Sequence, residues 1–177
     1  MRKLSNEELE RLSVEEFKRV EKVPLVVVLD NVRSLNNIGS VFRTADAFRL
    51  EGIYLCGITA TPPHREIHKT PLGATESVRW EYREQTKDVI AELKQKGYRI
   101  YSVEQTEAAV MLDQVQLPGN QKYALVFGHE IRGVDQQVVD MSDQCIEIPQ
   151  HGTKHSLNIS VAAGIVIWEL FRILAKK

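Results

Sequence analysis

The chain has 177 residues, of which 43% are hydrophobic and 27% charged, and its formal net charge is −1. That length and composition fit one compact globular domain with a sizeable core and exclude a disordered or low-complexity protein. The almost neutral charge excludes a uniformly basic surface, so a polyanionic partner would have to meet a local basic patch. No uncharged stretch reaches the roughly 18 apolar residues of a membrane span, and the N-terminus lacks the apolar segment of a signal peptide.

Neither cysteine nor histidine forms a recognisable metal-binding pattern. Cys56 and Cys145 stand alone without a CxxC pair, which indicates neither a zinc site nor a disulfide framework and fits a reducing cytosol. His151 and His155 have the spacing of a helical zinc site, but Gly152 lies between them and no third ligand is near. We therefore expect no metal site, no membrane attachment and a cytoplasmic location.

The first segment, residues 5–20, is predicted to form an amphipathic helix or two short helices. Ser5 and Ser13 are each followed three residues later by glutamate, which is the capping-box pattern. The basic residues of this segment form either a solvated helix face or an RNA contact, and the sequence leaves both readings open. We expect residues 1–22 to be a short helical extension that precedes one domain at 23–177.

A β-α-β unit is predicted next. Residues 25–29 form a Val-rich apolar run without alternation, which is typical of a strand buried on both faces. A polar loop leads into a helix predicted at 38–48, and a second strand is predicted at 52–57. Such units cross over with right-handed connections and build parallel sheets.

The middle of the chain is less regular. Residues 59–75 are predicted to form a loop that either folds over a phosphate chain or is a surface excursion. Its basic residues are His64, Arg65, His68 and Lys69. A charged helix is predicted at 84–96, a strand at 98–103 and a connector at 113–120.

The last third of the chain predicts two strands, at 123–127 and 145–148, that each end in a polar loop. In open α/β sheets ligands bind beyond the carboxyl ends of strands, so we expect a small ligand where these loops converge. The fold predicted is α/β, a mostly parallel sheet with helices on both faces. The final helix, 156–175, is apolar almost all round and needs cover on more than one side, which predicts a homodimer.

Two nucleotide-binding motifs are excluded. Gly128 and Gly133 have the glycine spacing of a P-loop, but Val134 and Asp135 follow where Lys and Ser or Thr are required. The GxGxxG pattern of dinucleotide-binding folds is absent.

Three polar clusters remain: Asn37 with Arg43, Glu130 with Arg132, and Ser156 with Asn158. An acid at a strand end is costly unless it is exposed or paired, so we expect Glu130 to pair with an arginine, with Arg43 as the first candidate. Arg43 has the alternative of pairing with a surface carboxylate. Ser156 is placed to cap the last helix, and capping alone would explain it.

In order and spacing, these clusters resemble the three motifs of the SpoU (TrmH-like) RNA methyltransferases, a family of the SPOUT superfamily. The motifs are NNIGSVFRTAD at 36–46, LVFGHEIRGV at 125–134 and IPQHGTKHSLNISVA at 148–162. The resemblance covers about residues 24–174. It implies an α/β knot whose C-terminal segment, roughly 122–177, forms a trefoil.

The resemblance also implies a cofactor, a reaction and roles for residues. S-adenosylmethionine would be held mainly by backbone groups of Gly128, Ile148 and Leu157, together with Val103 and Glu104. A ribose 2′-hydroxyl in tRNA or rRNA would receive the methyl group. Arg43 would act on that hydroxyl as a base or, because guanidinium is effectively always protonated, orient it and clamp a phosphate. The remaining catalytic candidates are Asn37, Ser156 and Asn158, as hydrogen-bond partners of ribose or phosphate, and Glu130, which would hold an arginine.

The separate N-terminal RNA-binding domain of many family members has no counterpart in the 22 residues before the first predicted strand. RNA would then be bound by the N-terminal helix, the 59–75 loop, the C-terminal lysines and the partner subunit. The competing hypothesis is a non-catalytic RNA-binding or cofactor-sensing protein on the same scaffold. A degenerate protein of that kind would be expected to lose Arg43 or the Ser156-Leu157-Asn158 turn, and this chain keeps both.

Overall fold

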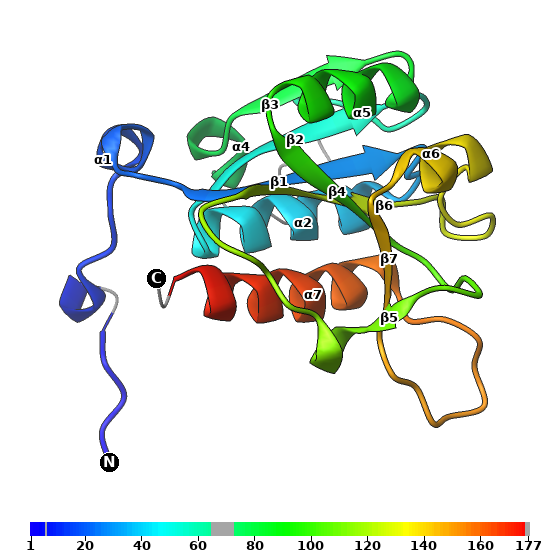
Figure 1. The fold of residues 1–177 in the computed structure, drawn as a ribbon. Coiled ribbons are helices and arrows are strands. Elements are labelled where there is room, and N and C mark those ends of the chain that lie inside the picture. The colour runs from blue at the N-terminus through cyan, green and yellow to red at the C-terminus, as the bar shows by residue number, and fades with distance from the viewer. Residues whose placement is uncertain (6, 65–72, 176–177) are drawn as a thin grey trace.

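A computed structural model describes residues 1–5, 7–64 and 73–175 of the chain. Seven strands form one sheet in the order β3-β2-β1-β6-β4-β7-β5, and every neighbouring pair is parallel (Figure 1). The strands are β1 Val23–Asp30, β2 Leu50–Cys56, β3 Trp80–Arg83, β4 Tyr98–Val103, β5 Val110–Met111, β6 Lys122–Phe127 and β7 Gln144–Glu147. The predicted parallel α/β architecture is confirmed.

Helices cover both faces of the sheet, as predicted. Helices α2 (Leu35–Ala47) and α7 (Ile159–Leu174) pack against each other on one face. Helices α5 (Thr86–Gln95) and α6 (Gln136–Met141) cover the other face. The short elements are α1 Val14–Arg19, α4 Ala74–Ser77 and the 3-10 helices Glu7–Leu9 and Leu112–Gln114.

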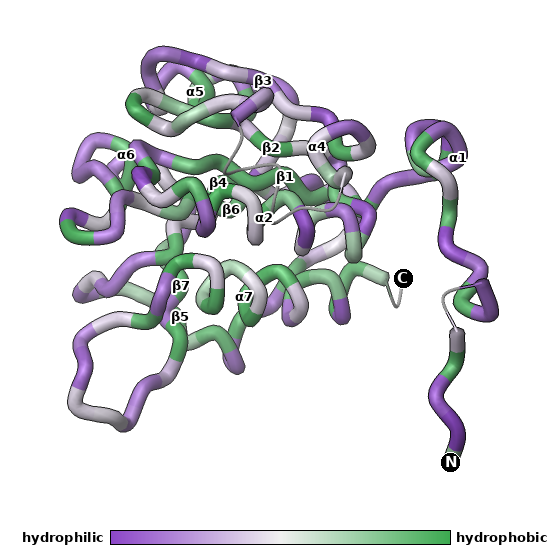
Figure 2. Tube along the Cα trace, turned by 180° about the vertical axis from the view of Figure 1, so that it is seen from behind, coloured by the Kyte–Doolittle hydropathy of each residue, from purple (hydrophilic) through white to green (hydrophobic). Residues whose placement is uncertain are grey.

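Strand β1 shows why the apolar run at 25–29 does not alternate. Leu25, Val27 and Leu29 belong to the core beneath α2 and α7, whereas Val26 and Val28 belong to the core beneath α5 and α6. All five side chains are buried, because β1 lies between β2 and β6 with helices on both sides. Figure 2 shows these strands as largely hydrophobic and the loop that follows β7 as polar.

The two strands at the edges of the sheet were not predicted. Strand β3 contains Trp80, Glu81, Tyr82 and Arg83, and none of these side chains is fully buried, so the strand lacks an apolar run. Strand β5 has only two residues, Val110 and Met111. Edge strands are often short and polar, which removes the pattern that identifies central strands.

Several predicted boundaries shift. Helix α2 begins at Leu35 rather than Ile38, because the Ser34 hydroxyl accepts a hydrogen bond from the Asn37 N–H and caps the helix. Helix α5 starts at Thr86, and Gly97 follows its end with a φ of +81°. The predicted 59–75 loop contains the start of α4, and Arg65, His68 and Lys69 lie outside the described residues.

The N-terminal segment forms two short helices, one of the two predicted arrangements. The capping box of Ser13 and Glu16 starts α1, and Phe17 is the only buried residue among those described before β1. The segment that precedes α1 extends away from the sheet (Figure 1). No described helix is long and apolar enough to cross a membrane.

Candidate active site

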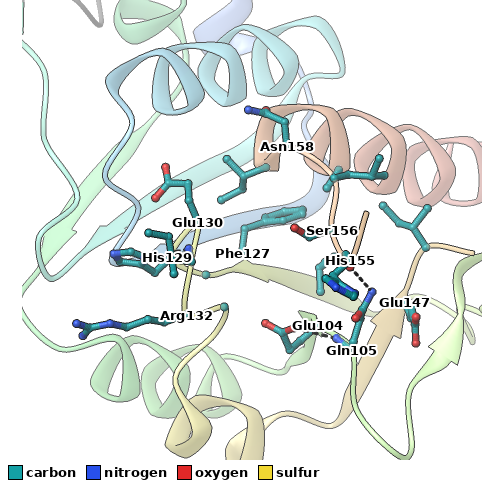
Figure 3. A pocket seen from close by; sticks show the side chains of 18 of the residues that line it. Glu104, Gln105, Phe127, His129, Glu130, Arg132, Glu147, His155, Ser156 and Asn158 are labelled. Carbon is teal, nitrogen blue, oxygen red and sulfur yellow. Dashed lines mark hydrogen bonds between the residues drawn. The ribbon is translucent and has the colours of Figure 1, made fainter. Parts of the chain in front are cut away.

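A cavity of about 520 Å³ lies at the carboxyl ends of β4, β6 and β7 (Figure 3). Its walls come from three separate segments: the residues after β4, the loop after β6 and the loop between β7 and α7. This is the strand-end location that the topology predicted. Within the described ranges, no group of three His, Cys, Asp or Glu side chains is arranged to hold a metal ion.

Eight of the ten predicted site residues line this one cavity. They include all five cofactor candidates, Val103, Glu104, Gly128, Ile148 and Leu157, and three catalytic candidates, Glu130, Ser156 and Asn158. Asn37 and Arg43 are not part of the lining. Residues 50 or more positions apart in the sequence therefore meet because parallel strands end at one edge of the sheet.

We call residues 128–134, which follow β6, the β6 loop. His129 and Gly133 close it by exchanging two backbone hydrogen bonds, of 2.9 and 2.8 Å. The His129 ring nitrogen Nδ1 also accepts a hydrogen bond from the Ile131 N–H at 3.0 Å. Gly128 is required sterically, because a Cβ there would overlap the Gly133–Val134 peptide. Gly133 has a φ of +70°, in the left-handed region that favours glycine, and a Cβ there would displace the Glu104 carboxylate.

Glu130 binds the residues at the start of α2 and pairs with none of the arginines that the structure describes. Its carboxylate accepts hydrogen bonds from the N–H groups of Arg33 (3.0 Å) and Ser34 (2.9 Å) and from the Asn37 amide (3.1 Å). Burial alone would raise the Glu130 pKa, but these donors outweigh it, and the pKa lies below its ordinary value. The expected Glu130–Arg43 pair is therefore wrong, because backbone donors at the N-terminus of α2 satisfy the acid.

The motif residues of α2 occupy different environments. Asn37, in the first turn, is only 6% exposed and points its amide to Glu130. Arg43 lies six residues further along the same helix and is exposed. In Figure 3, Glu130 and Asn158 lie on the side of the cavity nearer α2, and Glu104 and Glu147 lie on the opposite side. The α2 side thus carries two of the three catalytic candidates that line the cavity.

We call residues 148–158 the β7 loop. Residues 151–158 are all exposed, and within the described part of the chain one hydrogen bond joins this stretch to another segment, from the Gln105 amide to the His155 carbonyl at 2.9 Å. Ser156 does not cap α7, contrary to prediction. Asn158 is the cap, because its side-chain oxygen accepts the Ser160 N–H at 2.8 Å.

Sequence reasoning missed several lining residues, among them Gln105, Glu147, Gln150 and His155. Their signal was weak, since they lie in or after the strands predicted at 98–103 and 145–148, and polar residues near strand ends are too common to single out. Glu104 joins two walls: its carboxylate accepts the N–H groups of Gln105 and Val134, both at 2.9 Å. Of the residues that the structure describes, three glutamates and one arginine line the cavity, which suits a positively charged small ligand.

The fold and cavity define an open α/β protein with a cavity, at the carboxyl edge of a parallel sheet, of the kind that suits a small ligand. Residues 24–168 match the SpoU rRNA Methylase family, and the chain belongs to that family. The resemblance seen in the three motifs is thereby confirmed.

Relatives and solved structures agree with this membership. Over 155 residues the chain is 33% identical to a Staphylococcus aureus (strain MSSA476) protein assigned to the TrmH family of tRNA/rRNA methyltransferases. The match covers 88% of this chain but only 61% of that protein, so the chain spans about three-fifths of the length of this relative.

Among solved structures, the A. aeolicus TrmH/SpoU tRNA modifying enzyme superposes with a TM-score of 0.81 at 26% identity, covering 92% of this chain and 81% of that one. An AdoMet-bound rRNA methyltransferase from Sinorhizobium meliloti superposes with a TM-score of 0.80 at 26% identity, covering 89% of this chain and 60% of that one.

Proposed function

We propose that the protein transfers a methyl group from S-adenosylmethionine to a ribose 2′-hydroxyl in tRNA or rRNA. The observation that carries this proposal is the convergence of eight candidate residues on one cavity, six of them from the second and third motifs and two from the end of β4. Family membership and the AdoMet-bound S. meliloti structure support the choice of cofactor. The acid-rich lining suits a sulfonium cation.

The residues present fit such a cofactor. Backbone groups of Gly128, Ile148 and Leu157 would hold it, and the contact between Gly128 and the Gly133–Val134 peptide fixes the wall formed by the β6 loop. Bound S-adenosylmethionine would supply an electrophilic methyl group. The protein would align a ribose hydroxyl with that methyl group, which lowers the entropic cost of bringing the two together. It would also help the proton of the hydroxyl to leave.

The ribose would approach from the side of the cavity nearer α2, where Glu130 and Asn158 lie. Asn158 and Ser156 would hydrogen-bond ribose or phosphate. Glu130, by holding the Asn37 amide and the N–H groups of Arg33 and Ser34 just before α2, would position motif one rather than an arginine side chain. Arg43, exposed on the same helix, would orient the hydroxyl and clamp a neighbouring phosphate.

Substitution of Arg43 tests this assignment. Arg43→Ala should lower methyl transfer by at least about 100-fold, because orientation of the nucleophile is lost, while S-adenosylhomocysteine binding stays within about twofold of wild type. Methyl incorporation from labelled S-adenosylmethionine and calorimetric titration measure the two quantities. Transfer at a comparable rate in the variant would contradict the role of Arg43.

The activity itself is tested by incubating the purified chain with labelled S-adenosylmethionine and total unmodified RNA. Incorporation at a ribose, located by mapping the labelled nucleotide, supports the enzyme and distinguishes tRNA from rRNA. Cofactor binding without incorporation would instead support a non-catalytic cofactor-sensing or RNA-binding protein.

We also propose a homodimer. Helix α7 exposes an apolar stripe, Val161, Ile165 and Trp168, of which Val161 and Trp168 are each 50% exposed. Such a stripe favours burial against a second copy. Ile165→Glu should convert a dimer to a monomer in sedimentation experiments, and a wild-type chain that is monomeric at micromolar concentration would overturn the proposal.

The trefoil knot belongs to the same proposal. Strand β7 lies between β4 and β5, and residues 104–121 connect β4 through β5 to β6 on the other side of β4. The hydrogen bond from Gln105 to His155 supports a path of the β7 loop through that connection. An experimental structure whose backbone contains no knot would contradict this proposal.

We further propose that residues 1–22 are an extension of a methyltransferase domain at 23–177 and that the protein is cytoplasmic. The start of β1 at Val23 supports the boundary, and two free, buried cysteines suit a reducing compartment. Removal of residues 1–22 should leave S-adenosylhomocysteine binding intact, and cell fractionation tests the location.

A further inference from the structure

The tip of the β6 loop carries an apolar side chain that the fold does not use. Ile131 is 83% exposed although it lines the mouth of the cavity, and no buried core cluster includes it. Its neighbour Arg132 is also exposed and, in Figure 3, extends away from the cavity. Among the described residues, no ion pair or side-chain hydrogen bond holds the Arg132 guanidinium.

The loop that presents Ile131 is held in one conformation by hydrogen bonds. The backbone pair of His129 and Gly133 closes the turn, the His129 ring accepts the Ile131 N–H, and the Glu130 carboxylate binds the start of α2. A side chain presented on a fixed turn loses little conformational freedom when a ligand covers it. An exposed apolar residue beside a guanidinium that no described side chain binds therefore has the features of a preformed contact site.

We propose that Ile131 and Arg132 contact the nucleobases that flank the methylated ribose and help to select the RNA. This inference rests on the proposed function. A ribose that reaches the cavity must leave its own base and the neighbouring bases at the mouth, where Ile131 lies. Unpaired RNA bases pack on apolar side chains and on guanidinium planes, and sequence-specific recognition of RNA targets such unstacked bases.

A second subunit is the other possible occupant of an exposed apolar residue. The α7 stripe offers a larger and continuous apolar surface for that purpose, whereas Ile131 stands alone between Glu130 and Arg132. A single apolar residue flanked by charges at the mouth of a cofactor cavity suits a nucleotide better than a protein interface.

Ile131→Ala tests the proposal in the full chain, with Ile58→Ala as the matched control. Ile58 is also an exposed isoleucine, 62% accessible, next to the carboxyl end of β2, but it does not line the cavity. Methyl transfer is measured with labelled S-adenosylmethionine on total unmodified RNA, then on a short transcript of the mapped site and its variants at the flanking bases.

We expect Ile131→Ala to raise KM for RNA roughly tenfold and to reduce the discrimination among flanking-base variants, with S-adenosylhomocysteine affinity and sedimentation unchanged. Arg132→Ala should act in the same direction, and Ile58→Ala should match wild type. The assignment would be overturned if Ile131→Ala left KM and the discrimination among flanking bases unchanged, or if both isoleucine variants raised KM equally. It would also be overturned if Ile131→Ala weakened S-adenosylhomocysteine binding or changed the oligomeric state. Failure of the wild type to methylate any RNA would instead remove the proposed function.

Discussion

The β6 loop and the β7 loop line the same cavity but differ in how the chain holds them. The β6 loop is closed by the two backbone hydrogen bonds between His129 and Gly133, and it packs so tightly that a Cβ at Gly128 would overlap backbone atoms. Further hydrogen bonds join it to the Glu104 carboxylate and to the residues at the start of α2. In the β7 loop, the eight residues 151–158 are all exposed, and Gln105 provides its one hydrogen bond to another segment of the described chain.

The difference assigns the two loops different tasks. A loop whose polar groups are satisfied and whose packing is tight keeps one geometry without ligand, as a surface that aligns reacting groups requires. A loop with few contacts opens at low free-energy cost and can close over a ligand that enters. The β6 loop is therefore the fixed wall of the cavity, and the β7 loop is the wall that ligand binding would order.

A glycine in each loop gives the strongest test of this contrast. Gly128→Ala should destabilise the protein by about 3 kcal/mol, because the added Cβ overlaps backbone that cannot move without opening the His129–Gly133 pair. Gly152→Ala in the β7 loop should change stability by less than about 0.5 kcal/mol, because nothing lies within 4 Å of the new Cβ.

Denaturant unfolding and S-adenosylhomocysteine titration of both variants measure the effect. The Gly128 variant should lose cofactor binding by roughly 100-fold, as the wall is displaced, and the Gly152 variant should bind as wild type does. Equal stability of the two variants would remove the distinction between a fixed and an adaptable wall.

Glu130→Gln should have an intermediate effect. The amide keeps one acceptor oxygen, so the N–H of Arg33 or of Ser34 loses its partner, at a cost of about 1 kcal/mol for partly exposed groups. The wild-type advantage should depend on pH, because hydrogen bonds depress the Glu130 pKa below its ordinary value. A carboxylate with a depressed pKa stabilises the fold above its unfolded-state pKa, about 4.3 for glutamate, and loses that contribution as pH falls through the folded value.

Unfolding of wild type and Glu130→Gln between about pH 7 and pH 3 checks this sign, since about 4.3 lies inside that window. The stability difference should be constant near neutrality and shrink below about pH 4. A difference that grows as pH falls would mean that Glu130 is not held as a carboxylate by these donors.

The contrast between the loops also explains what the sequence could predict. Apolar runs such as residues 25–29 specify central strands, and the glycines at 128 and 133 mark the tight loop, so the place of the cavity followed from topology. The partners of Glu130 did not follow, because Ser34 and Arg33 lie 96 and 97 residues away and contribute backbone N–H groups, which any residue could supply. Asn158 replaced Ser156 as the cap because both residue types cap helices and only the backbone path decides between them.

The smallest expected effect concerns Gln105, which joins the β7 loop to the residues after β4. Gln105→Ala should change overall stability by less than about 0.5 kcal/mol, because it removes one exposed hydrogen bond. It should nevertheless weaken S-adenosylhomocysteine binding roughly threefold, since the ligand must then order a looser β7 loop. Hydrogen exchange separates these effects: amides at 150–157 should exchange faster in the variant and gain protection with ligand, while amides at 128–134 stay unchanged. If the β7 loop of the ligand-free wild type were already as protected as the β6 loop, both walls would be preformed, and Gln105 would contribute to neither.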